Sequence, residues 1–121
     1  MKREIKFRAW EKNTKKMYDR VLASNGDPCS IVWDCDRKDW LNFDECSGYI
    51  MQYTGLKDKN GTGIYEGDIV IAVLSTGEII FEDGCFIVKW LKDEDFFNNV
   101  LSRHANCITI VGNIYETPLL V

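Results

Sequence analysis

One short stretch of the chain places oxygen-bearing side chains at the spacing of a calcium-binding loop. In residues 58–63, Asp58, Asn60 and Thr62 would fill the first, third and fifth ligand positions, and a glycine follows them. Such a loop needs a bidentate carboxylate at its twelfth position, which here is Ile69 inside an apolar run. Because that ligand is missing, we interpret the stretch as a plain turn and expect neither a metal nor another cofactor.

Cysteine and histidine are the next candidates for chemistry. The five cysteines share no CxxC spacing and are Cys29, Cys35, Cys46, Cys85 and Cys107. A structural zinc site usually needs four Cys or His ligands in closely spaced pairs, and His104 is the only histidine. His104 lies three residues before Cys107, but we interpret this pair of base and thiol as unrelated. The chain is therefore predicted not to be an enzyme, and its thiols are predicted to be mostly buried.

Two further patterns resemble sites for catalysis or for phosphate binding, but neither is complete or specific. Glu66 and Asp68 flank a glycine and could act as acid and base, but such residues more often cap turns. The run Gly61-Thr62-Gly63 lacks the Gly-Lys-Ser/Thr that completes a phosphate-binding loop. Neither pattern predicts an activity.

The basic N-terminal segment is the best candidate for binding. Lys6, Arg8 and Trp10 would share one face of a regular strand, and basic and aromatic side chains together can bind single-stranded nucleic acid. Residues 1–20 carry eight basic and three acidic side chains, whereas the remaining 101 residues carry seven and sixteen. We therefore favour pairing of this segment with an acidic surface, on its own chain or on a neighbouring subunit. Nucleic-acid binding is the alternative.

Length and composition predict one compact domain in the cytoplasm. The chain has 121 residues, 45% of them hydrophobic, which is enough for a core without disulfides or metal. It holds no run of 18 apolar residues, so no membrane-spanning helix is expected. Its first residues are charged where a signal peptide would need an apolar segment.

The pattern of apolar residues predicts a mainly β protein. In residues 1–22, apolar and charged side chains alternate around a polar turn, which predicts a β-hairpin. Residues 23–47 show no clean period and are interpreted as a variable insert, in which the apolar run at residues 31–33 could form one short strand. Residues 48–121 contain short strands between tight turns and are predicted to form a small SH3-like barrel over about residues 48–117, with one short helix from Asp93. The predicted strands are 49–53, 69–74, 78–82, 85–91, 107–111 and 114–115.

Three blocks of sequence resemble the YopX family of phage and prophage proteins. They are residues 7–18, residues 51–70 and residues 110–116. The resemblance implies a phage-encoded, mainly β protein that self-associates, and it brings no catalytic residues. The residues of these blocks that we expect to have structural roles are Tyr53, Gly55, Gly61, Tyr65, Gly67, Asp68, Gly112 and Tyr115.

Together these observations predict a non-enzymatic, oligomeric protein-interaction module of bacteriophage or prophage origin. Its expected partners are further copies of itself and an unknown phage or host protein, with no membrane contact. The alternative is a nucleic-acid-binding regulator that uses the basic N-terminal strand.

Overall fold

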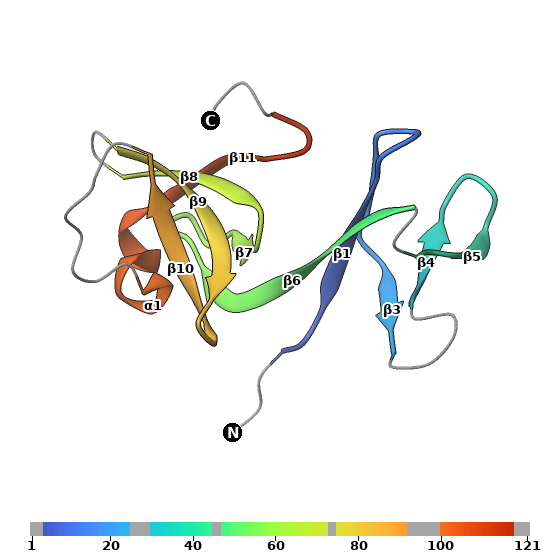
Figure 1. Cartoon of the computed structure of the whole chain (residues 1–121), viewed down its shortest axis with the longest axis horizontal. Helices are drawn as coiled ribbons and strands as arrows, with labels where there is room; N and C mark the ends of the chain where they lie inside the picture. Colours follow the sequence, from blue (N-terminus) through green and yellow to red (C-terminus); the bar gives the residue numbers. More distant parts are fainter. Residues whose placement is uncertain (1–3, 25–29, 45–46, 73–74, 92–99, 118–121) are drawn as a thin grey trace. The chain divides into compact units, whose positions relative to one another are not determined.

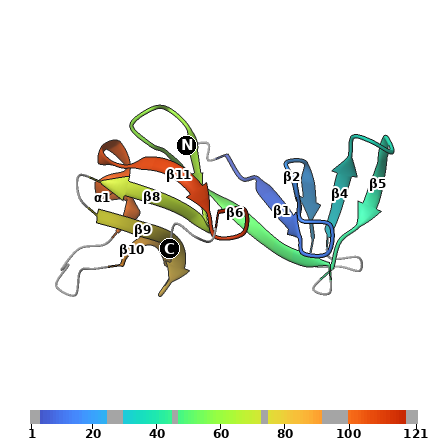
Figure 2. The same cartoon turned by 90° about the horizontal axis from the view of Figure 1, so that it is seen from above.

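The chain folds into two compact units that are built almost entirely from antiparallel strands (Figure 1). The computed structural model describes residues 4–24, 30–44, 47–72, 75–91 and 100–117. We call residues 2–52 the N-terminal unit and residues 53–121 the C-terminal unit. The predicted mainly β class is confirmed. The two units divide after residue 52, within one long strand that begins at Gly48 (Figure 2). The boundary expected from the sequence was the start of that strand, near residue 48.

A central strand organises the first part of the N-terminal unit. β1 (Phe7–Glu11) pairs with β2 (Lys16–Tyr18) on one side and with the first half of β6 (Gly48–Lys57) on the other. The hairpin predicted in residues 1–22 is present, but its second strand ends at Tyr18. The chain then enters another sheet at Val21.

That second sheet comes from the segment that showed no clean period. β3 (Val21–Ala23), β4 (Ser30–Asp34) and β5 (Asp39–Asn42) form a three-stranded antiparallel sheet. Val32 lies on one face of this sheet and packs in a buried cluster. The other buried members of the cluster are Ala9 of β1, Tyr18 of β2 and Phe43. The opposite face also carries large apolar side chains. The sequence therefore does not alternate between apolar and polar residues, and the period-two signal of a strand is absent.

The C-terminal unit contains a four-stranded sheet in the order β10-β9-β8-β11. Its strands are β8 (Asp68–Ala72), β9 (Ser75–Glu82), β10 (Cys85–Trp90) and β11 (Thr109–Asn113). The second half of β6 pairs instead with a short strand, β7 (Gly63–Tyr65). Closure of this unit into an SH3-like barrel stays a prediction.

The core of the C-terminal unit joins these strands to a short helical segment. The fully or almost fully buried side chains of this core are Ile64, Val70, Ile79, Val88, Trp90, Leu101, Ala105 and Ile108. The helical segment consists of α1 (Leu101–His104) and a 3-10 turn (Ala105–Cys107). The helix predicted from Asp93 lies almost wholly outside the described residues, and Val100 at its end has an extended backbone.

Two predictions for this unit are wrong. The wholly apolar run at residues 69–74 predicts a strand that is covered on both faces, but Ile71 is 41% exposed. Gly112 and Asn113 are residue types typical of a turn, and they stand between the predicted strands at residues 107–111 and 114–115. They belong to β11 instead, where the pairing with β8 shifts between Ile110 and Gly112. Glycine here fits a bulge in the strand, a role that sequence alone does not separate from a turn.

Candidate interaction surfaces

The aspartate at the head of the calcium-like stretch binds backbone amides. Asp58 is 6% exposed, and its Oδ1 accepts hydrogen bonds from the N–H groups of Asn60 and Thr62, both at 2.9 Å. Its Oδ2 accepts a third from the N–H of Ile110 in β11 at 3.1 Å. The N–H of Lys59 also donates to the carbonyl of Ile108 at 3.1 Å. The turn is thereby attached to a strand that lies about fifty residues further along the chain.

These bonds set the charge state of Asp58. Burial alone would raise the pKa of its carboxyl, but the three backbone N–H groups outweigh burial and hold the pKa below its usual value. The carboxylate therefore stays charged at neutral pH while its oxygens are used by the fold. Its geometry is that of an anchored turn.

A second buried aspartate orders the next turn of the same stretch. Asp68 is 2% exposed, and its Oδ2 accepts the N–H of Tyr65 at 2.8 Å. Between them Gly67 has φ +88, donates its N–H to the carbonyl of Ile79 at 2.8 Å and accepts the N–H of Ile114 at 2.9 Å. This residue therefore connects the turn to β9 and to the segment that follows β11.

The other residues of the resemblance also lie at structural positions. Tyr53 faces Tyr65 across β6 and β7, with ring centroids 5.4 Å apart. Gly55 and Gly61 have positive φ angles of 87° and 84°. Gly112 lies at the shift in β11, and the N–H of Tyr115 donates to Oδ1 of Asn113 at 3.0 Å.

Asn113 is a residue that sequence reasoning missed. Its Oδ1 also accepts the N–H of Glu116 at 2.8 Å, so one side chain closes the turn after β11. The sequence signal was present, because asparagine commonly bonds to backbone groups two residues further on. The sequence pattern places the turn at this residue, whereas the structure places it directly after Asn113.

The proposed binding face of Lys6, Arg8 and Trp10 is not an exposed basic and aromatic surface. Lys6 precedes β1 and pairs with Glu4 at 2.9 Å, with both side chains exposed. Nε of Arg8 lies 3.4 Å from the sulfur of Met51. Trp10 is only 8% exposed, so its ring cannot serve as a stacking platform. Ala9 and Trp10 are both buried, so both faces of β1 are covered. The expected alternation of buried and exposed residues along β1 is therefore not observed.

The described cysteines and the histidine do not form a reactive cluster. Cys35 and Cys107 are exposed and Cys85 is partly exposed, contrary to the expected burial, whereas Cys29 and Cys46 lie outside the described residues. His104 lies edge-on to Trp90, with ring centroids 6.0 Å apart. Within the described ranges, no three His, Cys, Asp or Glu side chains come together as metal ligands would.

An aromatic pair lies on the outer face of the β3–β4–β5 sheet. Trp33 and Trp40 are cross-strand partners, and their rings meet edge to face with centroids 5.3 Å apart. The guanidinium of Arg20 lies over both rings, 5.3 Å and 5.6 Å from their centroids. The N–H of Trp33 donates to the carbonyl of Arg20 at 3.0 Å, which fixes this arginine beside β4. We call these three residues the Trp-Arg cluster.

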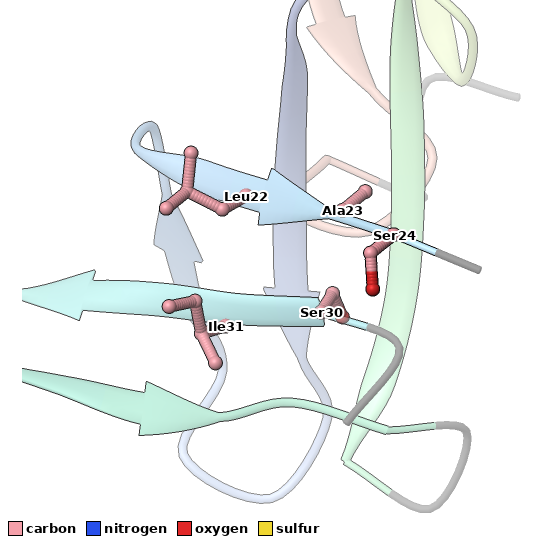
Figure 3. A pocket seen from close by; sticks show the side chains of 5 residues that line it. All are labelled: Leu22, Ala23, Ser24, Ser30 and Ile31. Carbon is pink, nitrogen blue, oxygen red and sulfur yellow. The ribbon is translucent and has the colours of Figure 1, made fainter. Parts of the chain in front are cut away.

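The same sheet face continues into an apolar hollow (Figure 3). Leu22 and Ile31 are cross-strand partners on β3 and β4, and Leu22 is 57% exposed. With Ala23, Ser24 and Ser30 they line an open hollow of about 210 Å³. Because Ile31 and Trp33 are two residues apart on one strand, the hollow and the Trp-Arg cluster face the same side.

The C-terminal unit has an apolar groove of its own. Phe81 and Phe86 are cross-strand partners on β9 and β10, with centroids 5.0 Å apart, and Phe81 is 54% exposed. Together with Leu56, Val100 and Leu101 they line a groove of about 270 Å³. We call it the Phe81 groove. The exposed acids Glu82 and Asp83 adjoin it at the hairpin turn.

In the part of the chain that the structure describes, no helix has the length and apolar character needed to cross a bilayer.

Comparison with known proteins identifies relatives over nearly the whole chain. The family described as YopX protein matches residues 6–121. The crystal structure of protein EF1440 from Enterococcus faecalis is similar, with 30% sequence identity and a TM-score of 0.68. That alignment covers 98% of this chain and 99% of the other. A search of the curated proteins found no match.

Proposed function

The chain belongs to the YopX family, and from this premise we propose that it is a phage- or prophage-encoded, non-enzymatic module that binds further copies of itself. In this proposal it acts in the host cytoplasm and presents the assembled surface to a phage or host protein in turn. An SH3-like arrangement of the C-terminal unit is part of the same proposal.

The observation that carries the proposal is the Phe81 groove. Its phenylalanine pair, Phe81 and Phe86, comes from a hairpin at the edge of the sheet, since β10 is an outer strand. Large aromatic side chains that line an open apolar groove are typical of surfaces that become buried on association. Burial of a side chain such as Phe81, which is 54% exposed, would supply favourable free energy to such a contact.

Charge complementarity favours a second copy of the chain as the occupant. The C-terminal unit carries five basic and ten acidic residues, whereas residues 1–20 carry eight basic and three acidic. Glu82 and Asp83 are exposed in the hairpin between Phe81 and Gly84, which both line the groove. The N-terminal segment offers Ile5, which is 58% exposed, next to Lys6. We therefore assign the segment around Ile5 and Lys6 of a second copy to the groove.

A pair of matched substitutions tests the groove. Phe81→Ser should raise the dissociation constant of the oligomer by about 10-fold or more, because it removes a central aromatic contact. Ile71→Ser changes a side chain that is also exposed, by 41%, and lies outside the groove, so it should leave assembly unchanged. Light scattering over a dilution series measures both. Equal effects of the two substitutions would contradict the role of the groove.

A charge exchange tests the occupant. Lys6→Glu and Glu82→Lys should each weaken self-association, because each places like charges at the proposed contact. Mixing the two variants should restore part of the association through the reversed pair. If the mixture assembles no better than either variant alone, the N-terminal segment does not bind at this groove.

A further inference from the structure

We propose that the outer face of the β3–β4–β5 sheet binds single-stranded nucleic acid, with the Trp-Arg cluster stacking against unpaired bases and the neighbouring basic turns contacting phosphates. The site differs from the N-terminal strand, which the sequence suggested as a nucleic-acid-binding face and where Trp10 is buried. It also lies on another surface than the Phe81 groove, so it does not depend on self-association.

The aromatic part of the site is already in place. Trp33 and Trp40 are partly exposed on the face opposite Val32, the residue that enters the core. Arg20 is exposed and lies over both rings, and its backbone is bonded to β4. Indole rings and guanidinium planes are the groups on which single-stranded bases stack, and such stacking tolerates different base sequences.

The basic part of the site comes from two turns that lie side by side. Lys12 and Lys15 are exposed in the turn between β1 and β2, and Lys38 is exposed in the turn between β4 and β5. The ammonium of Lys16 joins the two turns, at 3.3 Å from Asp34 and 3.2 Å from Asp36. Lys16 and two members of the Trp-Arg cluster, Arg20 and Trp33, line one open hollow, so the cluster adjoins this junction.

The local charge favours an anionic ligand. Residues 12–20 and 33–40 carry six basic and four acidic side chains, a balance of +2 in a chain of net charge −4. Two of those four acids, Asp34 and Asp36, are engaged by Lys16, and Asp34 also lies 3.9 Å from Nε of Arg37. Positive charge at exposed turn tips beside aromatic rings is the arrangement that follows a phosphate backbone.

Lysine content distinguishes this ligand from a protein partner. The cores of protein–protein interfaces are depleted in lysine, whereas phosphate contacts are made largely by lysine and arginine. A duplex is a poorer fit, because its bases are already stacked on each other and cannot lie against Trp33 or Trp40.

An open hollow of about 170 Å³ between the β2–β3 link and Trp33, lined in part by Lys16 and Arg20, adjoins the cluster.

Fluorescence anisotropy with labelled dT15 and rU15 tests the proposal. The full chain should bind at least one of them at low salt, and binding should weaken as salt rises with a logarithmic slope of about −2, as expected for about three phosphate contacts. Trp33→Ala and Trp40→Ala should each weaken binding by about 5-fold to 100-fold. A 15-base-pair duplex should bind more weakly than either single strand. The Phe81→Ser variant should bind as the unchanged chain does.

Charge-matched variants keep the test decisive if a tryptophan variant fails to fold. Lys12→Gln, Lys15→Asn and Lys38→Asn together should reduce both affinity and the salt slope; asparagine tolerates the positive φ angles of 57° and 55° at residues 15 and 38. The control removes the same charge from exposed lysines of the C-terminal unit, with Lys57→Gln, Lys59→Gln and Lys89→Gln together.

Several outcomes would overturn the proposal. They are no binding of either oligonucleotide at low salt, equal losses in the two lysine variants, and a duplex that binds as tightly as the single strands. A protein interface would be indicated instead if no oligonucleotide binds while Trp33→Ala and Trp40→Ala lower the mass measured by light scattering. If the unchanged chain binds an oligonucleotide but shows no self-association by light scattering, only the proposed function is contradicted.

Discussion

At the scale of single residues, two buried carboxylates explain much of the stretch from residue 51 to residue 70. Asp58 and Asp68 resemble ligands or catalytic acids in the sequence, and both accept backbone hydrogen bonds in the structure. A small fold with several tight turns has many backbone N–H groups without a partner in a sheet, and buried carboxylates satisfy them. The acids therefore stabilise the C-terminal unit.

Asp58→Ala should destabilise the protein by about 2–4 kcal/mol, because it leaves the three N–H groups of Asn60, Thr62 and Ile110 without their acceptor. Asp58→Asn should cost less, since one carbonyl oxygen remains as an acceptor. Urea unfolding at pH 7 measures both. Glu116→Ala changes a carboxylate on the turn after β11 and should have a smaller effect than Asp58→Ala.

Acid should unfold the protein in part through the same carboxyl. The pKa of Asp58 is lower in the folded protein than in the unfolded chain, so its contribution is complete above the unfolded pKa of about 4 and is lost as pH falls through the folded value. The pKa of Asp34 is also held low: burial raises it, but bonds from the backbone N–H groups of Asp36 and Arg37 and from Lys16 outweigh that effect.

The expected result is a fall in the free energy of unfolding below about pH 4 that is smaller in Asp58→Asn than in the unchanged chain. Part of the fall should persist in the variant because Asp34 remains. Denaturant titrations between pH 7 and pH 3 measure it. Identical pH profiles for the two proteins would show that Asp58 titrates alike in the folded and unfolded states.

Gly67 tests a backbone requirement. Its φ of +88 disfavours any side chain, and a β-branched one most, so Gly67→Val should destabilise by about 1–3 kcal/mol or more. Gly61→Asn is the control, because Gly61 also has a positive φ but is exposed and open, and asparagine tolerates this region. Thermal melting of the two variants should separate them clearly; equal melting temperatures would contradict the requirement.

At the scale of elements, the sequence predicted strands best where a turn had a specific chemistry. Asp83 and Gly84 have φ angles of 52° and 81°, and the hairpin of β9 and β10 lies where their dipeptide placed it. β4 was indicated only by the apolar run at residues 31–33, and β5 was missed, because Trp33 and Trp40 stand on the outer face while Val32 enters the core. A sheet with apolar side chains on both faces shows no alternation.

The pairing of β1 with β6 yields a prediction at this scale. A Cβ atom at Gly48 would overlap the carbonyl oxygen of Trp10, so Gly48→Ala must push the two strands apart. Amide hydrogen exchange should therefore accelerate in β1 and in residues 48–52, and much less in β9 and β10 of the other unit. Tyr49→Ala, at a neighbouring side chain that is 49% exposed, is the control. Unchanged protection in β1 would contradict the predicted close approach.

At the scale of the whole molecule, the pattern of apolar residues predicted the mainly β class, whereas the division into units could not be predicted. A ten-residue strand, β6, passes from one unit to the other, and nothing in its sequence marks the passage. The candidate surfaces were also beyond a one-dimensional pattern. Arg20 meets Trp33 and Trp40 only through cross-strand pairing, and Phe81 meets Phe86 in the same way.

Charge provides the link between the sequence and the proposed assembly. The basic N-terminal segment and the acidic C-terminal unit were visible in the sequence, and the structure adds an apolar groove at the edge of the acidic unit. A groove with an acidic border and a basic segment with an exposed Ile5 are complementary within one sequence. Self-association is therefore the central claim.

Light scattering of the chain as it elutes from a size-exclusion column tests that claim most directly. We predict a mass that is a multiple of 14.0 kDa when the protein is loaded at about tens of micromolar, falling on dilution as mass action requires. A constant mass of 14.0 kDa at every concentration would contradict self-association.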